Sequence, residues 1–217
     1  DKKIVLSNLI DLLKFGFWMT VSNIVGPFMV AADRFIIASI LGASILTYYT
    51  VPQDIVLRLL IIPAAIATAW FPRFAKLNTY SDIQKSKELA SLGYKYIFLI
   101  LGPICMILAL FSKKLLEIWI NIEFAENTWL IALILLIGII FNALAHIPLA
   151  SLQATGKVKT TAFIHVGELF FYLPLLFYFV PSFGIEGAAV IWTSRAILDF
   201  VFLFIFNHYK FNDYSKL

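Results

Sequence analysis

Six long apolar stretches run through the 217-residue chain, at roughly 13–32, 45–70, 92–112, 128–150, 160–181 and 186–206. Each has about the ~20 residues that a helix needs to cross a hydrocarbon core of ~30 Å. Lipid offers no partner for backbone N–H and C=O groups, so stretches of this length fold as helices. Strands of a membrane barrel would be shorter and would alternate polar with apolar residues. The pattern predicts an all-α, polytopic membrane protein with six transmembrane helices.

Lysine and arginine are distributed unequally between the loops on the two sides of the predicted membrane. Of the seventeen, three lie within spans (Arg58, Lys95 and Arg195) and three fall on one side (Arg34, Lys113 and Lys114). The other eleven fall on the opposite side: Lys2, Lys3, Lys14, Arg73, Lys76, Lys85, Lys87, Lys157, Lys159, Lys210 and Lys216. The positive-inside rule therefore predicts that both ends, the 73–91 loop and the 155–159 turn are cytoplasmic. This topology explains the net charge of +4, and we expect no nucleic acid as a partner.

The composition and the loops argue against an enzyme. Charged residues make up 14% of the chain, against roughly 25% in soluble domains. The loops hold no glycine-rich phosphate loop, no HExxH helix and no Ser/His/Asp set. The single cysteine, Cys105, lies inside the third span, which leaves neither a disulfide framework nor a cysteine metal site. We therefore predict no catalytic residues, no metal site and no cofactor.

Two segments outside the spans have helical patterns of their own. Residues 78–91 combine Lys, Glu and Ser with apolar residues, which predicts a short amphipathic segment on the cytoplasmic surface. Residues 113–123 repeat apolar residues at helical spacing around Trp119, which predicts an interfacial helix on the outer face. The whole chain, 1–217, is then expected to form a single transmembrane lobe.

Ionisable side chains occur at membrane depth, where a charge at the bilayer centre costs at least ~2.5–3.5 kcal/mol. Such groups usually face a cavity or one another. Three pairs stand at i,i+3 or i,i+4 spacing, which places both members on one face of a helix. They are Asp54 with Arg58, His165 with Glu168, and Arg195 with Asp199.

The pair in the second span is the strongest candidate for substrate contact. Gln53 adds a polar group beside Asp54 and Arg58, and together they could line a hydrated cavity. Arginine suits an anionic head group, because its planar fork of donors grips two phosphate oxygens and stays charged.

The other two pairs leave alternatives open. Arg195 and Asp199 could contact substrate, or could neutralise each other and fix helix packing. His165 with Glu168 has the composition of a proton relay, since histidine titrates near neutral pH, but hydration near the cytoplasmic interface would explain the pair equally well. The isolated His146 is expected to be a packed or helix-bonded residue rather than a ligand.

Three stretches of the sequence resemble a known family. They cover 13–42, 48–74, and the motif Gln153-Ala-Thr-Gly-Lys157-Val-Lys159 with Phe183-Gly-Ile-Glu-Gly-Ala-Ala189 one span later. The chain resembles, over almost its whole length, the polysaccharide-repeat-unit (O-antigen type) flippases of the multidrug/oligosaccharidyl-lipid/polysaccharide exporter superfamily. The last motif is the most specific of the three.

The resemblance implies a MATE-like transporter of about twelve helices, in two six-helix lobes around a central cavity. This chain would be the C-terminal lobe, with the N-terminal lobe of the same protein as its partner. The implied substrate is a polyprenyl-diphosphate-linked glycan, flipped across the bacterial inner (plasma) membrane for O-antigen, capsule or exopolysaccharide biosynthesis. The lipid bilayer and a polysaccharide polymerase are the further partners that the resemblance suggests.

The resemblance also implies roles for individual residues. Arg58 and Pro63 resemble a cavity-lining Arg-Leu-x-x-x-Pro stretch of related lipid II flippases, so Arg58 is expected to face the diphosphate. Asp33 and Arg34 match the sugar-flippase pattern and are expected to line the outer part of the path. The full substrate-binding set is then Arg58, Asp54, Gln53, Arg34, Asp33 and Arg195, and the candidates for ion coupling are Glu168, His165 and Asp199.

Two other functions stay open on the sequence alone. A multidrug/cation antiporter of the same fold would place unpaired carboxylates and aromatic rings in its cavity, whereas here arginines accompany the carboxylates. A membrane-embedded polysaccharide polymerase or ligase would need a large outer loop with catalytic residues, which the chain lacks.

Overall fold

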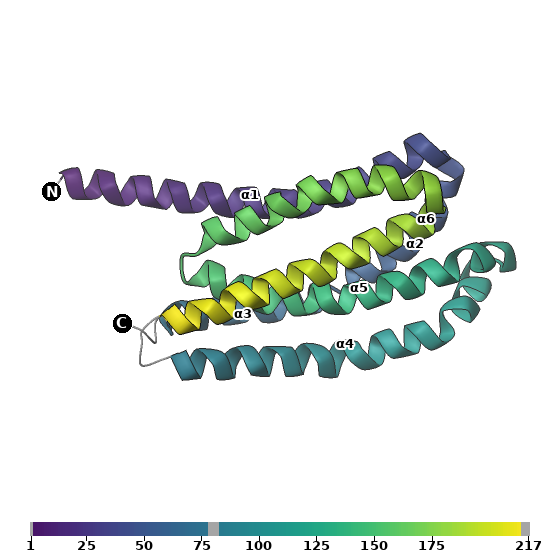
Figure 1. The fold of residues 1–217 in the computed structure, drawn as a ribbon. Helices are drawn as coiled ribbons and strands as arrows, with labels where there is room; N and C mark the ends of the chain where they lie inside the picture. The colour runs from purple at the N-terminus through teal and green to yellow at the C-terminus, as the bar shows by residue number, and fades with distance from the viewer. Residues whose placement is uncertain (1, 78–82, 214–217) are drawn as a thin grey trace.

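The part of the chain that the structure describes forms six α-helices and contains no strand (Figure 1). The computed structural model describes residues 2–77 and 83–213, with side chains for 9–77 and 83–208. The helices are α1 (Lys2–Leu41), α2 (Ala43–Arg58), α3 (Ile61–Lys76), α4 (Ile83–Trp119), α5 (Ile122–Ala154) and α6 (Val158–Asp213).

Five stretches of described helix are long and apolar enough to cross a membrane. They are Leu9–Leu41, Ala43–Lys76, Ile83–Trp119, Ile122–Ala154 and Val158–His208. The prediction of an all-α polytopic membrane protein is therefore confirmed. The count of six crossings stays a prediction, because the expected spans 160–181 and 186–206 both fall within α6.

The helix α6 is folded back on itself. Gly184 inside it has φ 64° and ψ −148°, a backbone conformation that is essentially reserved for glycine. The chain reverses there, and the second half of α6 returns toward the end of the bundle from which the first half came (Figure 1). A straight helix of 56 residues would extend about 84 Å, far beyond a hydrocarbon core of ~30 Å. The reversal gives α6 the geometry that two crossings require.

The expected span 45–70 contains a break between α2 and α3. Leu59 and Leu60 donate to carbonyls three residues earlier, at 3.1 Å each, instead of four. Pro63 explains the break, because its ring lacks an N–H and clashes with the carbonyl four residues before it. Proline is tolerated in the first turn of a new helix, where N–H groups have no intrahelical acceptor. Arg58 is consequently the last residue of α2.

The helix α5 lies at the centre of the bundle. It packs against α2, α3, α4 and α6, and it is the most buried of the candidate spans. Its side chains Ile131, Leu135 and Ile139 are completely buried in the main core. Gly138 allows α6 to approach closely, since a Cβ added there would lie 2.6 Å from the ring of Trp192.

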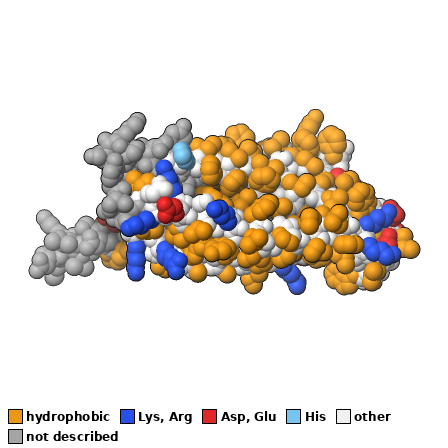
Figure 2. Space-filling model, turned by 90° about the horizontal axis from the view of Figure 1, so that it is seen from below, with side chains coloured by type: hydrophobic (Ala, Val, Ile, Leu, Met, Phe, Trp, Pro, Cys, Tyr) orange, Lys and Arg blue, Asp and Glu red, His pale blue; other side chains and the backbone are white. Residues whose placement is uncertain are grey.

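Large apolar side chains cover the outside of this bundle. Phe35, Leu110 and Phe170 are among the most exposed, and Figure 2 shows a broad apolar surface on which most charged side chains lie toward the two ends and a few lie between them. A soluble protein rarely exposes so large a continuous apolar surface. This surface is the one expected to face lipid in a multi-pass membrane protein.

The helix ends alternate between the two ends of the bundle. The start of α1, the start of α4, the α5–α6 connection and the end of α6 lie at one end, while the α1–α2 connection, the α4–α5 connection and the reversal within α6 lie at the other (Figure 1). The comparison of lysine and arginine numbers on the two sides of the membrane assumes this alternation of the connections. Which of the two ends faces the cytoplasm stays a prediction.

Two shorter segments complete the comparison with the sequence. Residues 83–91 of the expected amphipathic segment open α4, whereas 78–82 lie outside the described residues. Residues 113–119 form the last turns of α4, and Asn121 then caps α5 by accepting a hydrogen bond from the Phe124 amide at 2.7 Å. An ion pair of 2.8 Å between Lys113 and Glu126 joins the two helices across this connection.

Candidate functional site

Asp33 of α1 is the centre of a buried hydrogen-bond network. Its side chain is fully enclosed and accepts hydrogen bonds from Tyr49 Oη at 3.2 Å, Gln53 Nε2 at 3.4 Å and Tyr172 Oη. Gln53 Nε2 also donates to Tyr49 Oη at 3.1 Å. One carboxylate therefore connects α1, α2 and α6. The sequence suggested Asp33 and Gln53 as wall residues of the path, whereas the structure encloses both.

Arg34 forms a partly exposed cluster with α2, which shares Gln53 with the Asp33 network. Its Nε and Nη2 atoms each donate to Gln53 Oε1 at 3.3 Å, and its guanidinium pairs with Asp54. The side chains of Arg34 and Asp54 are 36% and 50% exposed. The spacing on α2 places Asp54 and Arg58 on one face of the helix, but Asp54 pairs with Arg34 of the neighbouring helix α1.

Arg58 stands apart from both clusters. It is exposed at the break after α2 and has no hydrogen bond or ion pair with any other described residue. Leu57 and Leu60, from the same stretch, line the central cavity described below, while Arg58 lies in the wall of none of the described cavities. The structure thus does not bring Arg58 together with the other expected site residues.

The two halves of α6 carry an ionic cluster of four side chains. His165 Nε2 lies 3.4 Å from Asp199 Oδ1, and Arg195 Nη1 lies 3.7 Å from Glu168 Oε2. His165 and Glu168, and likewise Arg195 and Asp199, share a helix face by their spacing, but the ion pairs form between the two halves of α6. The reversal at Gly184 explains these partners, because it makes the two halves of α6 antiparallel. Residue numbers therefore rise along one half while they fall along the other, which places His165 beside Asp199 and Glu168 beside Arg195.

Ser22 of α1 extends this cluster. Its hydroxyl lies 2.8 Å from His165 Nδ1, and its carbonyl oxygen lies 3.2 Å from the same nitrogen. His165 thus lies between Ser22 on one side of the imidazole ring and Asp199 on the other. Sequence reasoning missed Ser22, since a lone serine in an apolar span gives no pattern to find.

Several charged atoms of the cluster have no hydrogen-bond partner among the described residues. They are both carboxylate oxygens of Glu168, Arg195 Nε and Asp199 Oδ1, all of them buried. The ion-pair distances of 3.4 and 3.7 Å are longer than hydrogen bonds, which have N···O distances of roughly 2.7–3.2 Å. Buried charged groups are normally hydrogen-bonded, so this cluster has unused capacity for water, a proton or a ligand.

A cavity of about 480 Å³ adjoins the ionic cluster. Its wall includes His165, Arg195 and Asp199 of α6, together with Asn23 of α1 and His146 of α5. His146 Nδ1 lies 3.0 Å from the carbonyl oxygen of Asn142, which is the helix-bonded arrangement that the sequence favoured. We name this space the central cavity, since it lies among α1, α2, α5 and α6.

A second space of about 620 Å³ lies between the two halves of α6. Glu168 and Arg195 line it, and most of the remaining wall is apolar or aromatic, with Phe163, Phe171 and Phe202 among its residues. Arg195 therefore contributes to the walls of both spaces.

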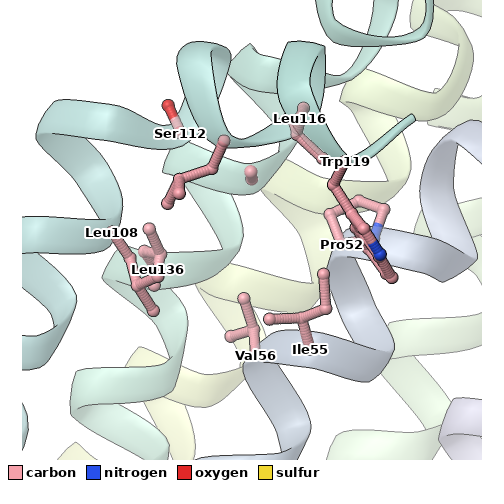
Figure 3. A pocket seen from close by; sticks show the side chains of 10 residues that line it. Pro52, Ile55, Val56, Leu108, Ser112, Leu116, Trp119 and Leu136 are labelled. Atoms are coloured by element: carbon pink, nitrogen blue, oxygen red, sulfur yellow. The ribbon is translucent and has the colours of Figure 1, made fainter. Parts of the chain in front are cut away.

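A third pocket, of about 250 Å³, lies among α2, α4 and α5 (Figure 3). Figure 3 shows Pro52, Leu108, Leu136 and Trp119 around it, and nearly all of its wall is apolar. The hydroxyl of Ser112 is already bonded to the carbonyl of Ala109 at 3.2 Å. This pocket has none of the charged groups that an anionic substrate needs.

No group of three or more His, Cys, Asp or Glu side chains that could hold a metal ion is found in the described residues.

Comparison with known proteins identifies the family to which the chain belongs. Residues 2–127 match the family model described as "Polysaccharide biosynthesis protein". The chain is 44% identical over 189 residues to a Shigella flexneri protein named "Putative O-antigen transporter", covering 87% of this chain and 44% of that protein. It is 26% identical over 211 residues to "Capsular polysaccharide biosynthesis protein CapF" of Staphylococcus aureus, covering 94% of this chain and 52% of that protein.

The chain thus spans about half the length of the curated relatives it matches. No solved structure matches it. The family match covers more than half of the chain, and the Shigella relative adds high identity over most of it. The chain therefore belongs to the polysaccharide biosynthesis protein family.

Proposed function

We propose that this chain is the C-terminal lobe of a two-lobed transporter that flips polyprenyl-diphosphate-linked oligosaccharides across the bacterial inner membrane. The product would serve surface polysaccharide biosynthesis, as O-antigen, capsule or exopolysaccharide. The family membership, the names of the relatives and the polytopic helical fold support a transporter rather than an enzyme. The coverage of about half of each relative fits one lobe of two.

The observation that carries the proposal is the position of Arg195. Its guanidinium has an unpartnered Nε and lies in the walls of both the central cavity and the space between the halves of α6. A guanidinium at such a place can grip the two phosphates of a diphosphate, and it stays charged inside a membrane protein. The apolar and aromatic wall of the second space suits the lipid tail or the faces of sugars.

The clusters around Arg195 take on supporting roles in this proposal. Glu168, His165 and Asp199 surround the site and could exchange a proton for substrate, which would couple transport to an ion gradient. Arg34 and Asp54, whose side chains are partly exposed, would meet the head group on its way out. The exposed Arg58 would contribute where the N-terminal lobe or the membrane surface completes its surroundings.

The proposal is tested in cells that lack the full-length gene encoding this chain. We expect polyprenyl-diphosphate oligosaccharide to accumulate on the cytoplasmic side of the membrane, and the wild-type gene to relieve it. Arg195→Gln should fail to relieve it at equal protein level, while Arg195→Lys should relieve it in part. Arg58→Gln makes the same chemical change at an arginine outside the described cavities, so comparing the two variants shows whether the effect is specific to Arg195. Full relief by Arg195→Gln would refute the role given to Arg195.

A cation antiporter of the same fold is the second candidate. It is favoured by one observation, the Glu168 carboxylate in an aromatic wall, whose oxygens accept no hydrogen bond from the described residues; such a setting suits an organic cation. Absence of glycolipid accumulation, together with new sensitivity of the deletion strain to cationic drugs, would select this candidate. A polysaccharide polymerase as partner would be checked separately, by cross-linking in cells that make both proteins.

A further inference from the structure

A small pocket at one end of the bundle lies away from the central cavity. Its volume is about 290 Å³, and it lies between the beginning of α4 and the end of α6. Its wall consists of Lys87, Ala90, Ser91, Tyr94, Phe204, Asn207 and His208. None of these residues lines the central cavity or the space between the halves of α6. We call this the α4–α6 pocket.

The wall of the α4–α6 pocket is unusually rich in hydrogen-bond donors. Lys87 carries an ammonium group, Ser91 and Tyr94 carry hydroxyls, and the side chains of Asn207 and His208 each offer an N–H. No aspartate or glutamate is part of this wall. Such a set of donors with a positive charge favours an anion, and a phosphate group in particular.

Two of these groups are buried without a partner. Asn207 is 4% exposed, and its Oδ1 atom has no hydrogen-bond partner among the described residues; the same is true of the Tyr94 hydroxyl. Buried polar atoms are usually satisfied, and each one left unmade costs about 1–3 kcal/mol. An amide can turn about its last bond, so Asn207 offers either a donor to a phosphate oxygen or an acceptor to a hydroxyl.

The surroundings hold these groups in place and add positive charge. The ring of Tyr94 packs against Phe200 and Phe204 with centroids 6.2 Å apart in each case, which fixes its position. Arg73, Lys76, Lys85 and Glu88 line another cleft, of about 350 Å³, at the first turns of α4, so that basic side chains outnumber acidic ones there. Basic pockets between helices at a membrane surface are suited to the head groups of anionic lipids.

We propose that the α4–α6 pocket binds a phosphate group, supplied by the head group of an anionic phospholipid at this membrane surface. The phosphate accepts hydrogen bonds from Lys87, Ser91 and Tyr94, and Asn207 contacts a phosphate oxygen or a head-group hydroxyl. The acyl chains extend along the exposed apolar face of α4, where Phe98 lies. A bound lipid would join α4 to α6, two helices with few direct contacts to each other.

The test is a binding titration on the purified chain in a neutral detergent, followed by native mass spectrometry. Phosphatidylglycerol is the anionic probe, phosphatidylcholine the zwitterionic one, and inorganic phosphate the competitor. We expect saturable binding of phosphatidylglycerol that Lys87→Gln weakens about tenfold and Tyr94→Phe about fivefold, which are the effects of losing one charged and one neutral hydrogen bond. Tyr94→Phe keeps the ring that packs on Phe200, so it tests the hydroxyl without disturbing the fold.

Matched controls lie elsewhere on the same helices or at the same end. Lys14→Gln removes an exposed lysine of α1, and Tyr96→Phe removes an exposed hydroxyl of α4, so both should leave binding unchanged. Displacement of the lipid by millimolar inorganic phosphate would identify a free phosphate ion as the ligand of this pocket. Binding that is equal for the wild type, Lys87→Gln and Tyr94→Phe would overturn the proposal, as would equal affinity for phosphatidylcholine.

Discussion

Asp33→Ala should destabilise the bundle strongly, because the Asp33 carboxylate is the shared acceptor of three donors from two other helices. Without it, the Tyr172 and Tyr49 hydroxyls lose their acceptor in a fully buried place, while Gln53 keeps its bond to Tyr49. Each buried donor left without a partner costs about 1–3 kcal/mol, so the expected loss is about 2–6 kcal/mol. That is a large part of the ~5–15 kcal/mol that stabilises a typical folded protein.

The assay is thermal unfolding of the detergent-solubilised chain, followed by tryptophan fluorescence and by the monodisperse peak in gel filtration. Asp54→Ala is the matched control, because its carboxylate is also ion-paired but is half-exposed. Exposed ion pairs contribute about 0–1 kcal/mol, so this variant should unfold close to the wild type. Asp33→Asn should fall between, since an amide retains one acceptor. Equal unfolding temperatures for Asp33→Ala and Asp54→Ala would refute the reasoning.

Two further predictions concern the reversal and the topology. Gly184→Ala should lower the free energy of unfolding by about 1–3 kcal/mol, because alanine is strained at φ 64° and ψ −148°. Gly167→Ala is the control, because Gly167 lies within a helix with open space around it, and this variant should be neutral or slightly stabilising. Unfolding temperatures measure both effects, and an unchanged temperature for Gly184→Ala would contradict the backbone conformation at Gly184. Lys114→Cys should react with a membrane-impermeant maleimide in intact cells, whereas Lys157→Cys should react only after the cells are permeabilised. The background should be low, because the native Cys105 is buried. Labelling of both variants in intact cells would reject the predicted orientation.

The sequence was sufficient to predict an all-helical membrane protein, because two of the physical signals for this fold are local in the sequence. Runs of apolar residues report membrane helices directly, and the lysine and arginine asymmetry predicts on which side each connection lies. The break at Leu59 and Leu60 was not foreseen, although Pro63 provides a reason for it. Where a helix breaks near a proline depends on the packing around it, and α5 packs against both α2 and α3.

The partners of the charged residues could not be predicted from spacing. An i,i+4 rule recognises that Arg195 and Asp199 share a face, but their actual partners, Glu168 and His165, are set by the antiparallel return of α6. Asp54 likewise meets Arg34 through the packing of α1 on α2. The residue types in the sequence therefore indicated that a polar interior exists, while its connections arise only from the tertiary fold.

The residues that the sequence missed have ordinary neighbours. Ser22 and Tyr172 lie in apolar stretches in which a hydroxyl is unremarkable, yet they complete the surroundings of His165 and Asp33. Arg58 shows the opposite case, since a motif selected it and the structure leaves it outside the cavities. In a single lobe, a residue that serves the surface between lobes would have this exposed position.

The ion pairs across α6 also bear on how the chain enters the membrane during its synthesis. Glu168 emerges from the ribosome before Arg195, so the first half of α6 reaches the translocon with an acidic side chain whose partner has not yet been made. Such a charge opposes insertion by ~2.5–3.5 kcal/mol near the centre of the bilayer. The abrupt turn at Gly184 brings the second half back immediately, which favours delivery of the two halves to lipid as one hairpin rather than in succession.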